Sequence, residues 1–181
     1  MPGAGEIFTI GHSTHEVGRF LALLRGQSIR CLADVRRYPG SRREPQFNAA
    51  ALESSLGSAG VTYAELGAEL GGRRRPRPGS SNDGWRVEGF RAYADHMDGP
   101  EFIAGLARLE ALAAEAATAL MCAEGDWRRC HRRLIADALV ARGWGVRHIL
   151  RDGALEQHRL TDFAVIDGGR LSYPAPQGRL A

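Results

Sequence analysis

Short apolar segments alternate with longer amphipathic ones along the chain, and this alternation limits the fold more than any other feature. Five segments have the length and apolar content of buried strands, at 7–10, 29–35, 61–66, 118–123 and 146–150. Segments with helical periodicity or helix-start signals lie at 14–25, 47–58, 86–97, 100–116 and 129–142. Such an order is typical of βα units around a mostly parallel sheet.

We therefore predict an α/β fold with one mostly parallel, Rossmann-like sheet of about five strands and helices on both faces. Two short apolar runs joined by a glycine-containing turn add a C-terminal β-hairpin over 163–173. No repeat or linker divides the chain, so the predicted single domain spans 1–181. Glycine, proline and arginine gather in 67–84, which predicts a long mobile loop.

Composition excludes several classes of enzyme. All 24 basic residues are arginine, so Schiff-base, pyridoxal-phosphate and lysine-dependent P-loop chemistry are ruled out. The net charge of +3 does not by itself indicate a nucleic-acid partner. Three cysteines are too few for a disulfide framework, and no apolar run is long enough for a membrane span. We expect a cytoplasmic protein with reduced thiols and no membrane partner.

Polar residues at the predicted strand ends are the first candidates for a site. Ligands of open α/β sheets bind beyond the carboxyl ends of the strands, where loops and helix starts converge. If the strands are neighbours, these side chains form one cluster. The candidates at these ends are Gly11, His12, Ser13, Asp34, Arg36, Tyr63, Cys122 and Glu124.

The first strand leads into a predicted capping box, in which Ser13 accepts an amide proton and Glu16 reaches back. A helix start is also a natural anion site, so the turn containing Gly11 and Ser13 is predicted to bind phosphate. His12 fits a packed histidine and a functional one equally well.

Asp34 ends an otherwise apolar strand, and Arg36 projects to the same face two residues later. One interpretation is an internal ion pair. The other is that Asp34 serves as a base or ligand contact while Arg36 binds an anion. The basic loop that follows contains Ser41 and can contact phosphates.

The segment 121–132 is the most informative. Cys130 is predicted in the first turn of a helix beside His131 and Arg132, which favours a thiolate. Cys122 and Arg128 have the C-x5-R spacing of phosphatase loops, a weak match because the loop is acidic and poor in glycine. Two thiols and a histidine can also bind metal, but the spacing is not a CxxC knuckle and the nearby arginines disfavour a dication. We predict no metal and no cofactor.

Ordered motifs across the chain give it a resemblance to a known family. Thr9–Ser13, Asp34–Arg36, Met121–Glu124 and Cys130–Arg132 together resemble the DUF488 family of bacterial and archaeal proteins of unknown function. The resemblance implies an α/β fold and supplies no reaction. The positions that fit the family pattern are Gly11, His12, Ser13, Asp34, Arg36, Pro39, Ser41, Tyr63, Cys122, Glu124, Cys130, His131, Arg132, His148 and His158.

The leading hypothesis is an enzyme, hydrolytic or glycosidic-bond-cleaving, that acts on a phosphate-bearing ligand such as a nucleotide or nucleic acid. One alternative is nucleophilic or redox thiol chemistry at Cys122 and Cys130, and another is a binding module without turnover. The sequence does not indicate whether the chain binds a protein partner. The candidate catalytic residues are Asp34, Glu124, His12, His131, Cys122 and Cys130. The candidate ligand-binding residues are Gly11, Ser13, Arg36, Ser41, Tyr63 and Arg132.

Overall fold

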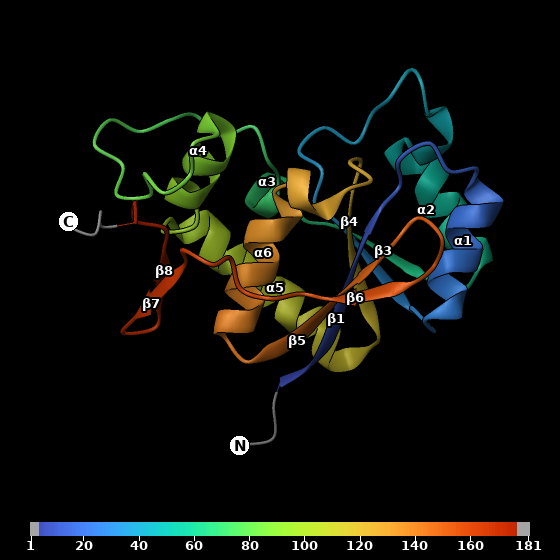
Figure 1. The fold of residues 1–181 in the computed structure, drawn as a ribbon. Helices are drawn as coiled ribbons and strands as arrows, with labels where there is room; N and C mark the ends of the chain where they lie inside the picture. Colours follow the sequence, from blue (N-terminus) through green and yellow to red (C-terminus); the bar gives the residue numbers. More distant parts are fainter. Residues whose placement is uncertain (1–3, 177–181) are drawn as a thin grey trace.

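A six-stranded sheet forms the centre of the computed structural model, which describes residues 4–176 (Figure 1). Its strands follow the spatial order β3-β2-β4-β1-β5-β6. The neighbours from β3 to β5 pair in parallel, and β6 is antiparallel to β5. The strands are β1 (Ala4–Gly11), β2 (Cys31–Asp34), β3 (Thr62–Glu65), β4 (Thr118–Cys122), β5 (Trp144–Ile149) and β6 (Leu155–Gln157). The predicted parallel sheet is confirmed, with β6 as an addition.

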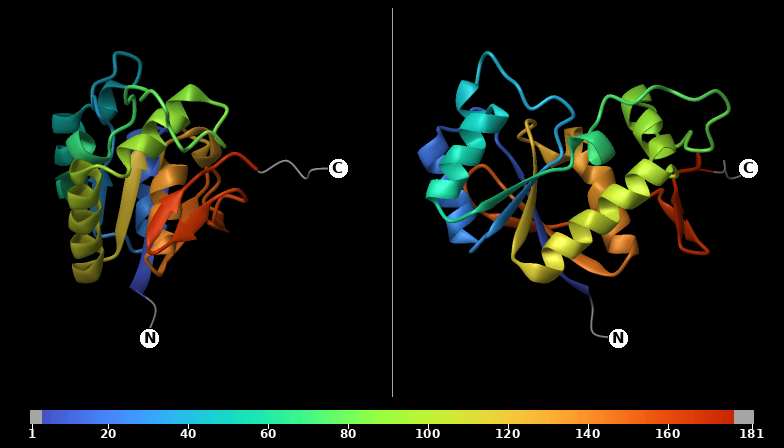
Figure 2. Two further views of the ribbon diagram at one scale, coloured as in Figure 1. Left: turned by 90° about the vertical axis from the view of Figure 1, so that its left-hand side faces the viewer. Right: turned by 180° about the vertical axis from the view of Figure 1, so that it is seen from behind.

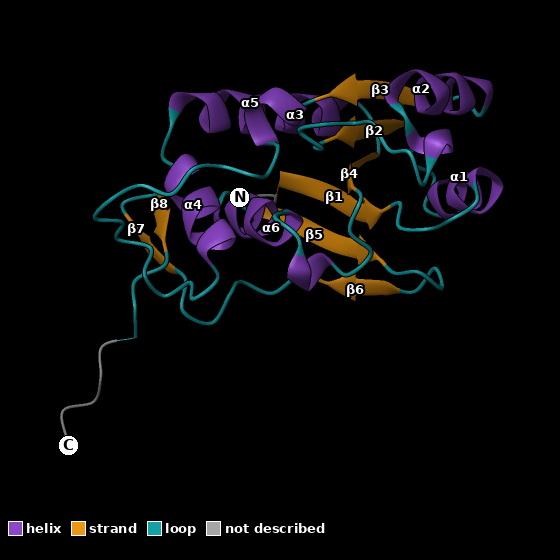
Figure 3. Ribbon diagram, turned by 90° about the horizontal axis from the view of Figure 1, so that it is seen from above, coloured by secondary structure: helices purple, strands orange, loops and turns teal. Residues whose placement is uncertain are grey.

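Helices cover both faces of this sheet (Figures 2 and 3). One face packs against α1 (Val17–Gly26) and α2 (Ala49–Ser58). The opposite face packs against α3 (Gly67–Leu70), α4 (Glu88–His96), α5 (Pro100–Glu115) and α6 (Arg132–Ala141). The C-terminal hairpin consists of β7 (Val165–Asp167) and β8 (Arg170–Ser172), as predicted.

The apolar runs at the centre of the sheet become strands because both of their faces are buried, as in β2 and β4. Along β1, Ile7 belongs to the core beneath α3–α6, and Phe8 belongs to the core beneath α1 and α2. Successive side chains of a strand point to opposite faces, so a sheet covered on both sides needs continuous apolar sequence. The two cores therefore fix β1 at the centre of the molecule.

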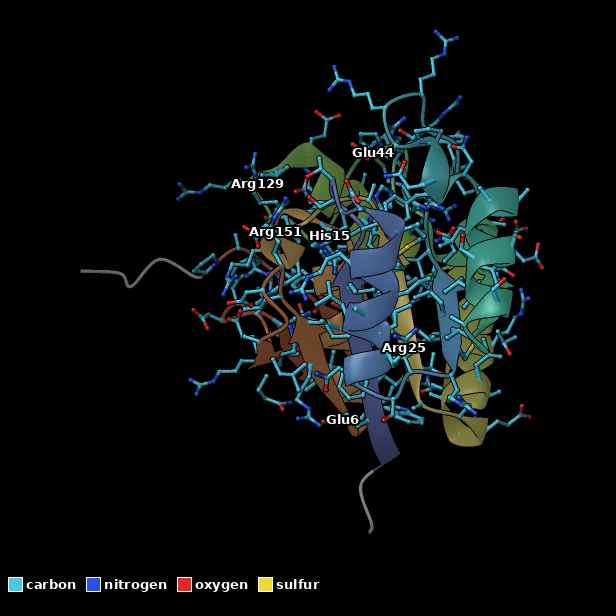
Figure 4. All side chains as sticks on the ribbon, turned by 90° about the vertical axis from the view of Figure 1, so that its right-hand side faces the viewer. Glu6, His15, Arg25, Glu44, Arg129 and Arg151 are labelled. Atoms are coloured by element: carbon cyan, nitrogen blue, oxygen red, sulfur yellow. The ribbon has the colours of Figure 1, made fainter. Side chains whose placement is uncertain are left out.

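Strand register brings the ends of β1, β2 and β4 together. Gly11 pairs with Cys122 and Asp34 pairs with Met121, so the three carboxyl ends lie side by side. These ends lie toward the top of Figure 1. Figure 4 shows Arg151 toward this end of the sheet and Arg25 toward the opposite end. The loops that follow the three strands can therefore build one site.

Three local predictions are wrong. The first helix begins at Val17 and not at residue 14, because Ser13 still donates its amide proton to the Ala123 carbonyl and continues the β1–β4 pairing. Ser13 has a φ of 47° and does not cap the helix. The helix predicted from residue 129 begins at Arg132, because η2 (Trp127–Arg129) forms a separate turn capped by Asp126. The predicted loop 67–84 begins with α3.

Among residues 4–176, no helix combines the length and the apolar content that a membrane crossing needs.

Candidate functional site

Asp34 and Arg36 form a buried ion pair at the end of β2. The Arg36 Nε and Nη2 atoms donate to the carboxylate at 2.9 and 2.6 Å, and the Arg36 backbone amide donates to it at 3.0 Å. The Tyr63 hydroxyl adds a bond of 2.7 Å to Asp34 Oδ2. Only 1% of Asp34 and 6% of Arg36 is exposed. The carboxylate is thus fully engaged, which favours the ion-pair interpretation of the sequence.

His12 extends this network on the side of Arg36. Its Nδ1 lies 2.9 Å from the Ser13 carbonyl and therefore carries the proton, which leaves Nε2 to accept from Arg36 at 3.3 Å. Burial lowers the pKa of His12 below its ordinary value. The ring stacks on Phe47 with 4.3 Å between centroids. His12 is therefore a neutral ring that accepts a hydrogen bond from Arg36 and helps to hold it in place.

The network also perturbs Arg36 and Tyr63. Burial alone would lower the pKa of Arg36, but the hydrogen bonds to Asp34 raise it. Burial and the Asp34 carboxylate raise the pKa of Tyr63 above its ordinary value. Both side chains consequently hold their protons, and neither is suited to serve as a base near neutral pH.

A second cluster joins the end of β4 to the start of α6. Cys122 ends β4, whereas Cys130 and His131 immediately precede α6. His131 Nδ1 lies 3.9 Å from Cys122 Sγ and 3.7 Å from Cys130 Sγ. Its Nε2 lies 3.1 Å from the Val35 carbonyl oxygen. The fold thus brings the three side chains together, and the prediction that Cys130 lies in the first turn of a helix is wrong because α6 begins at Arg132.

Arg132 stabilises negative charge on Cys130. Its backbone amide and Nε donate to Cys130 Sγ at 3.5 and 3.4 Å. Burial alone would raise the pKa of Cys130, but its hydrogen bonds with Cys122 and His131 and the charge of Arg132 lower it well below the ordinary value. The hydrogen bond to Cys130 and burial raise the pKa of Cys122. The pair therefore favours one thiolate, on Cys130.

A buried polar chain runs from Arg132 into the core. Arg132 donates to Thr9 Oγ1 at 3.2 Å, and Thr9 Oγ1 lies 2.7 Å from His148 Nδ1. His148 Nε2 contacts His158 Nδ1 at 2.9 Å, and His158 Nε2 contacts Asp137 at 2.8 Å. Burial lowers the pKa of His148 to about 2. Arg132 is only 1% exposed, and each of its guanidinium nitrogens donates to a partner within the protein, so it is not available to a ligand.

One pocket connects the cysteine–histidine cluster to exposed arginines. We call it the basic pocket, and its volume is about 260 Å³. The guanidinium carbons of Arg37 and Arg73 each lie 5.9 Å from the centre of the Tyr38 ring. Neither arginine has a carboxylate partner among residues 4–176. The lining residues are Arg36, Arg37, Tyr38, Gly40, Gly72, Arg73, Cys122, Ala123 and His131.

Three other predicted residues belong to a different pocket. Gly11, Ser13 and Glu124 line it together with Arg151, which donates to Ser13 Oγ at 3.1 Å. A Cβ atom at Gly11 would lie 2.0 Å from the Glu124 carbonyl oxygen, so this glycine serves close packing. Asp34 lines a third pocket, and the two predicted catalytic carboxylates therefore do not share one.

Arg128 and Ser41 have local structural partners. The Arg128 guanidinium forms an ion pair with Glu156 and lies over the Trp127 ring, 4.5 Å from its centroid. Arg128 and Cys122 line different pockets, so the phosphatase-loop spacing does not produce a phosphatase loop. Ser41 donates its amide proton to Asn48 Oδ1 at 2.6 Å and stabilises the turn before η1 (Pro45–Phe47).

The profile described as "Domain of unknown function DUF488" matches residues 16–139. The chain belongs to the DUF488 family. Comparisons with curated proteins and with solved structures each gave no significant match. The family description names no reaction, so the function of this DUF488 protein has to be argued from its geometry.

Sequence reasoning did not select Arg73, which lines the basic pocket, or Asp137, which ends the buried polar chain. Arg73 enters the basic pocket from the predicted loop 67–84, where it is one of four clustered arginines and nothing in the sequence distinguishes it from the others. Asp137 lies in an apolar helix, is completely buried and also accepts from the Tyr173 hydroxyl at 2.9 Å. Asp137 could have been found from the sequence, because an acidic residue on the apolar face of a helix indicates a buried carboxylate with hydrogen-bond partners.

Proposed function

We propose that this DUF488 protein is an enzyme that acts on a phosphate-bearing ligand of nucleotide type, bound in the basic pocket. The observation that carries the proposal is the position of Arg37 and Arg73, two unpaired arginines of the described chain, beside Cys122 and His131. A guanidinium offers several donors in one plane and is the side chain best suited to phosphate oxygens.

Tyr38 supports a ligand that also has a planar group. The ring lines the pocket and is 64% exposed, although two arginine guanidinium groups lie near it. Exposed aromatic rings beside basic grooves stack on nucleobases and contribute about 1–3 kcal/mol per base. If the base stacks on Tyr38 and the phosphate binds Arg37 and Arg73, the bonds between base and phosphate would lie near Cys122 and His131.

Two of the residues that line the pocket favour an enzyme over a binding module. Cys122 and His131 both line it, and thiol and imidazole are among the side chains that most often move protons or attack a substrate. A mechanism with two carboxylates has less support, because Asp34 is neutralised by Arg36 and Glu124 faces another pocket. The predicted hydrolysis is therefore assigned to the cysteine–histidine cluster.

Calorimetric titration with a nucleoside monophosphate and with inorganic phosphate tests the proposal. Arg37→Ala and Arg73→Ala should each weaken binding of both compounds by about tenfold, because a hydrogen bond to a charged group contributes about 1.5–3 kcal/mol. Tyr38→Leu should weaken only the nucleotide. Arg25→Ala removes the same charge at the far end of the sheet and should leave both affinities unchanged. Equal affinities in all four variants would refute the proposal.

Turnover distinguishes the enzyme from the binding module. The purified protein is incubated with a mixture of nucleotides, and the products are separated by chromatography. We expect loss of one nucleotide, with no loss in the His131→Gln variant. Binding that is sensitive to Arg37 but gives no product from any nucleotide would favour the binding module.

A further inference from the structure

The cysteine–histidine cluster has a property that phosphate binding does not require. Cys122 Sγ, Cys130 Sγ and His131 Nδ1 all lie within 4.8 Å of one another. No sequence motif places them there, because the end of β4 and the start of α6 meet only in the fold. Two sulfurs and one nitrogen are the ligand types that Zn²⁺ selects.

The orientation of His131 is that of a metal ligand. The Val35 carbonyl oxygen can only accept, so the proton of a neutral His131 ring lies on Nε2. The lone pair of Nδ1 then faces both sulfur atoms. Histidines that bind metal almost always donate their other ring N–H to a carbonyl or carboxylate, which fixes the tautomer.

The distances fit a tetrahedral ion. Bonds of about 2.3 Å to sulfur and about 2.05 Å to nitrogen give sulfur–nitrogen edges of about 3.6 Å and a sulfur–sulfur edge of about 3.8 Å. The two observed sulfur–nitrogen distances are 3.7 and 3.9 Å. The two sulfur atoms lie within 4.8 Å of each other, so shifts of at most about 1 Å would close the site around a metal.

The charges are also compatible with a dication. Two thiolates neutralise the charge of Zn²⁺, so the bound centre would not repel the arginines around it. Arg132 donates to Cys130 Sγ through its amide and its Nε, and such bonds stabilise a thiolate whether or not it binds metal. The nearby arginines were expected from the sequence to disfavour a metal, but they complement the thiolate ligands.

We propose that Cys122, Cys130 and His131 bind one Zn²⁺ ion and that its fourth position opens to the basic pocket. Cys122 and His131 line that pocket. Zinc sites with three protein ligands and an open position are catalytic, whereas structural sites use four. The sequence-based expectation of no metal is replaced by this proposal.

The role of the ion rests on the proposed function. With Cys122 and His131 as ligands, the attacking group would be a water at the fourth position, which the ion would make more acidic. Its oxygen would bond to phosphorus, the bond from phosphorus to the ester oxygen would break, and the leaving oxygen would take up a proton from solvent. The products of a phosphate monoester and water are then an alcohol and inorganic phosphate, with no change of oxidation state. The binding of the ion itself requires neither this reaction nor a nucleotide.

Zinc titration of the reduced wild-type chain against a chromogenic chelator tests the site. We expect one ion per chain. Cys122→Ser, Cys130→Ser and His131→Gln should each reduce the affinity by more than the roughly 100-fold that loss of an outer-sphere partner costs. Cys31→Ser is the matched control, because Cys31 lies at the start of β2 and outside the cluster. Zinc affinity that survives in both cysteine variants would overturn the proposal.

Cobalt gives a second measurement that needs no variant. Co²⁺ bound to the reduced wild-type protein should show thiolate-to-metal charge-transfer bands and the intense visible bands of a tetrahedral ion. A spectrum of octahedral cobalt without charge transfer would overturn the metal site. Stoichiometric zinc without phosphate affinity would refute only the proposed function, and phosphate affinity without zinc would refute only the metal site.

Discussion

Replacement of Asp34 by asparagine tests whether this carboxylate is a buried structural partner of Arg36. The substitution keeps the shape of the side chain and removes its charge, while Arg36 stays 6% exposed in its present position. Breaking a buried ion pair from one side costs about 3–5 kcal/mol because the other charge is left uncompensated. Asp34 also accepts from Tyr63 at 2.7 Å, and one of its oxygens becomes a donor in asparagine.

We therefore expect the free energy of unfolding to fall by about 4 kcal/mol in Asp34→Asn. With a urea dependence of about 2 kcal/mol per molar, the unfolding midpoint should fall by about 2 M. Asp98→Asn is the control, because it breaks the exposed ion pair with Arg170 and should cost less than about 1 kcal/mol. An Asp34→Asn, Arg36→Leu double variant should regain much of the loss. Equal, small losses in Asp34→Asn and Asp98→Asn would refute the reasoning.

Two further predictions concern pH and packing. Burial lowers the pKa of His148 to about 2, whereas the unfolded chain binds this proton near pH 6.5. The free energy of unfolding should thus fall with decreasing pH below 6.5, by up to about 1.4 kcal/mol per unit from His148 alone. Urea unfolding of His148→Gln between pH 7 and 5 should show a shallower slope, and an unchanged slope would contradict the assignment. Gly11→Ala should lower the unfolding temperature strongly, because its Cβ meets the Glu124 carbonyl. Gly18→Ala has open space and should raise that temperature slightly. The reverse order in calorimetry would contradict the packing.

Strands were more predictable than helix starts in this chain. Burial on both faces leaves a continuous apolar signal, as in β4, where Thr118, Ala119, Leu120 and Met121 are all completely buried. Helix starts depend on competition between local turns, which a single sequence does not resolve. The β1–β4 pairing extends through Ser13, and the η2 turn precedes α6, so both predicted starts were three residues early.

The site was predictable as far as strand ends determine it. Because β4 pairs in parallel with β1 and β2, Cys122 lies near the residues that follow those two strands. A cluster at this edge of the sheet could therefore be expected from the sequence. The direction of one side chain beyond a strand end is set by the local turn, and Glu124 consequently faces a different pocket from Cys122. Arg73 comes from a loop whose path depends on tertiary contacts, so only the structure places it.

A crystal of the reduced protein soaked with a nucleoside monophosphate tests the central claim most directly. The claim is that the ligand occupies the basic pocket. We predict phosphate density between the guanidinium groups of Arg37 and Arg73, with the base against Tyr38. Density over the turn of Gly11 and Ser13 beside Arg151, with an empty basic pocket, would contradict the account.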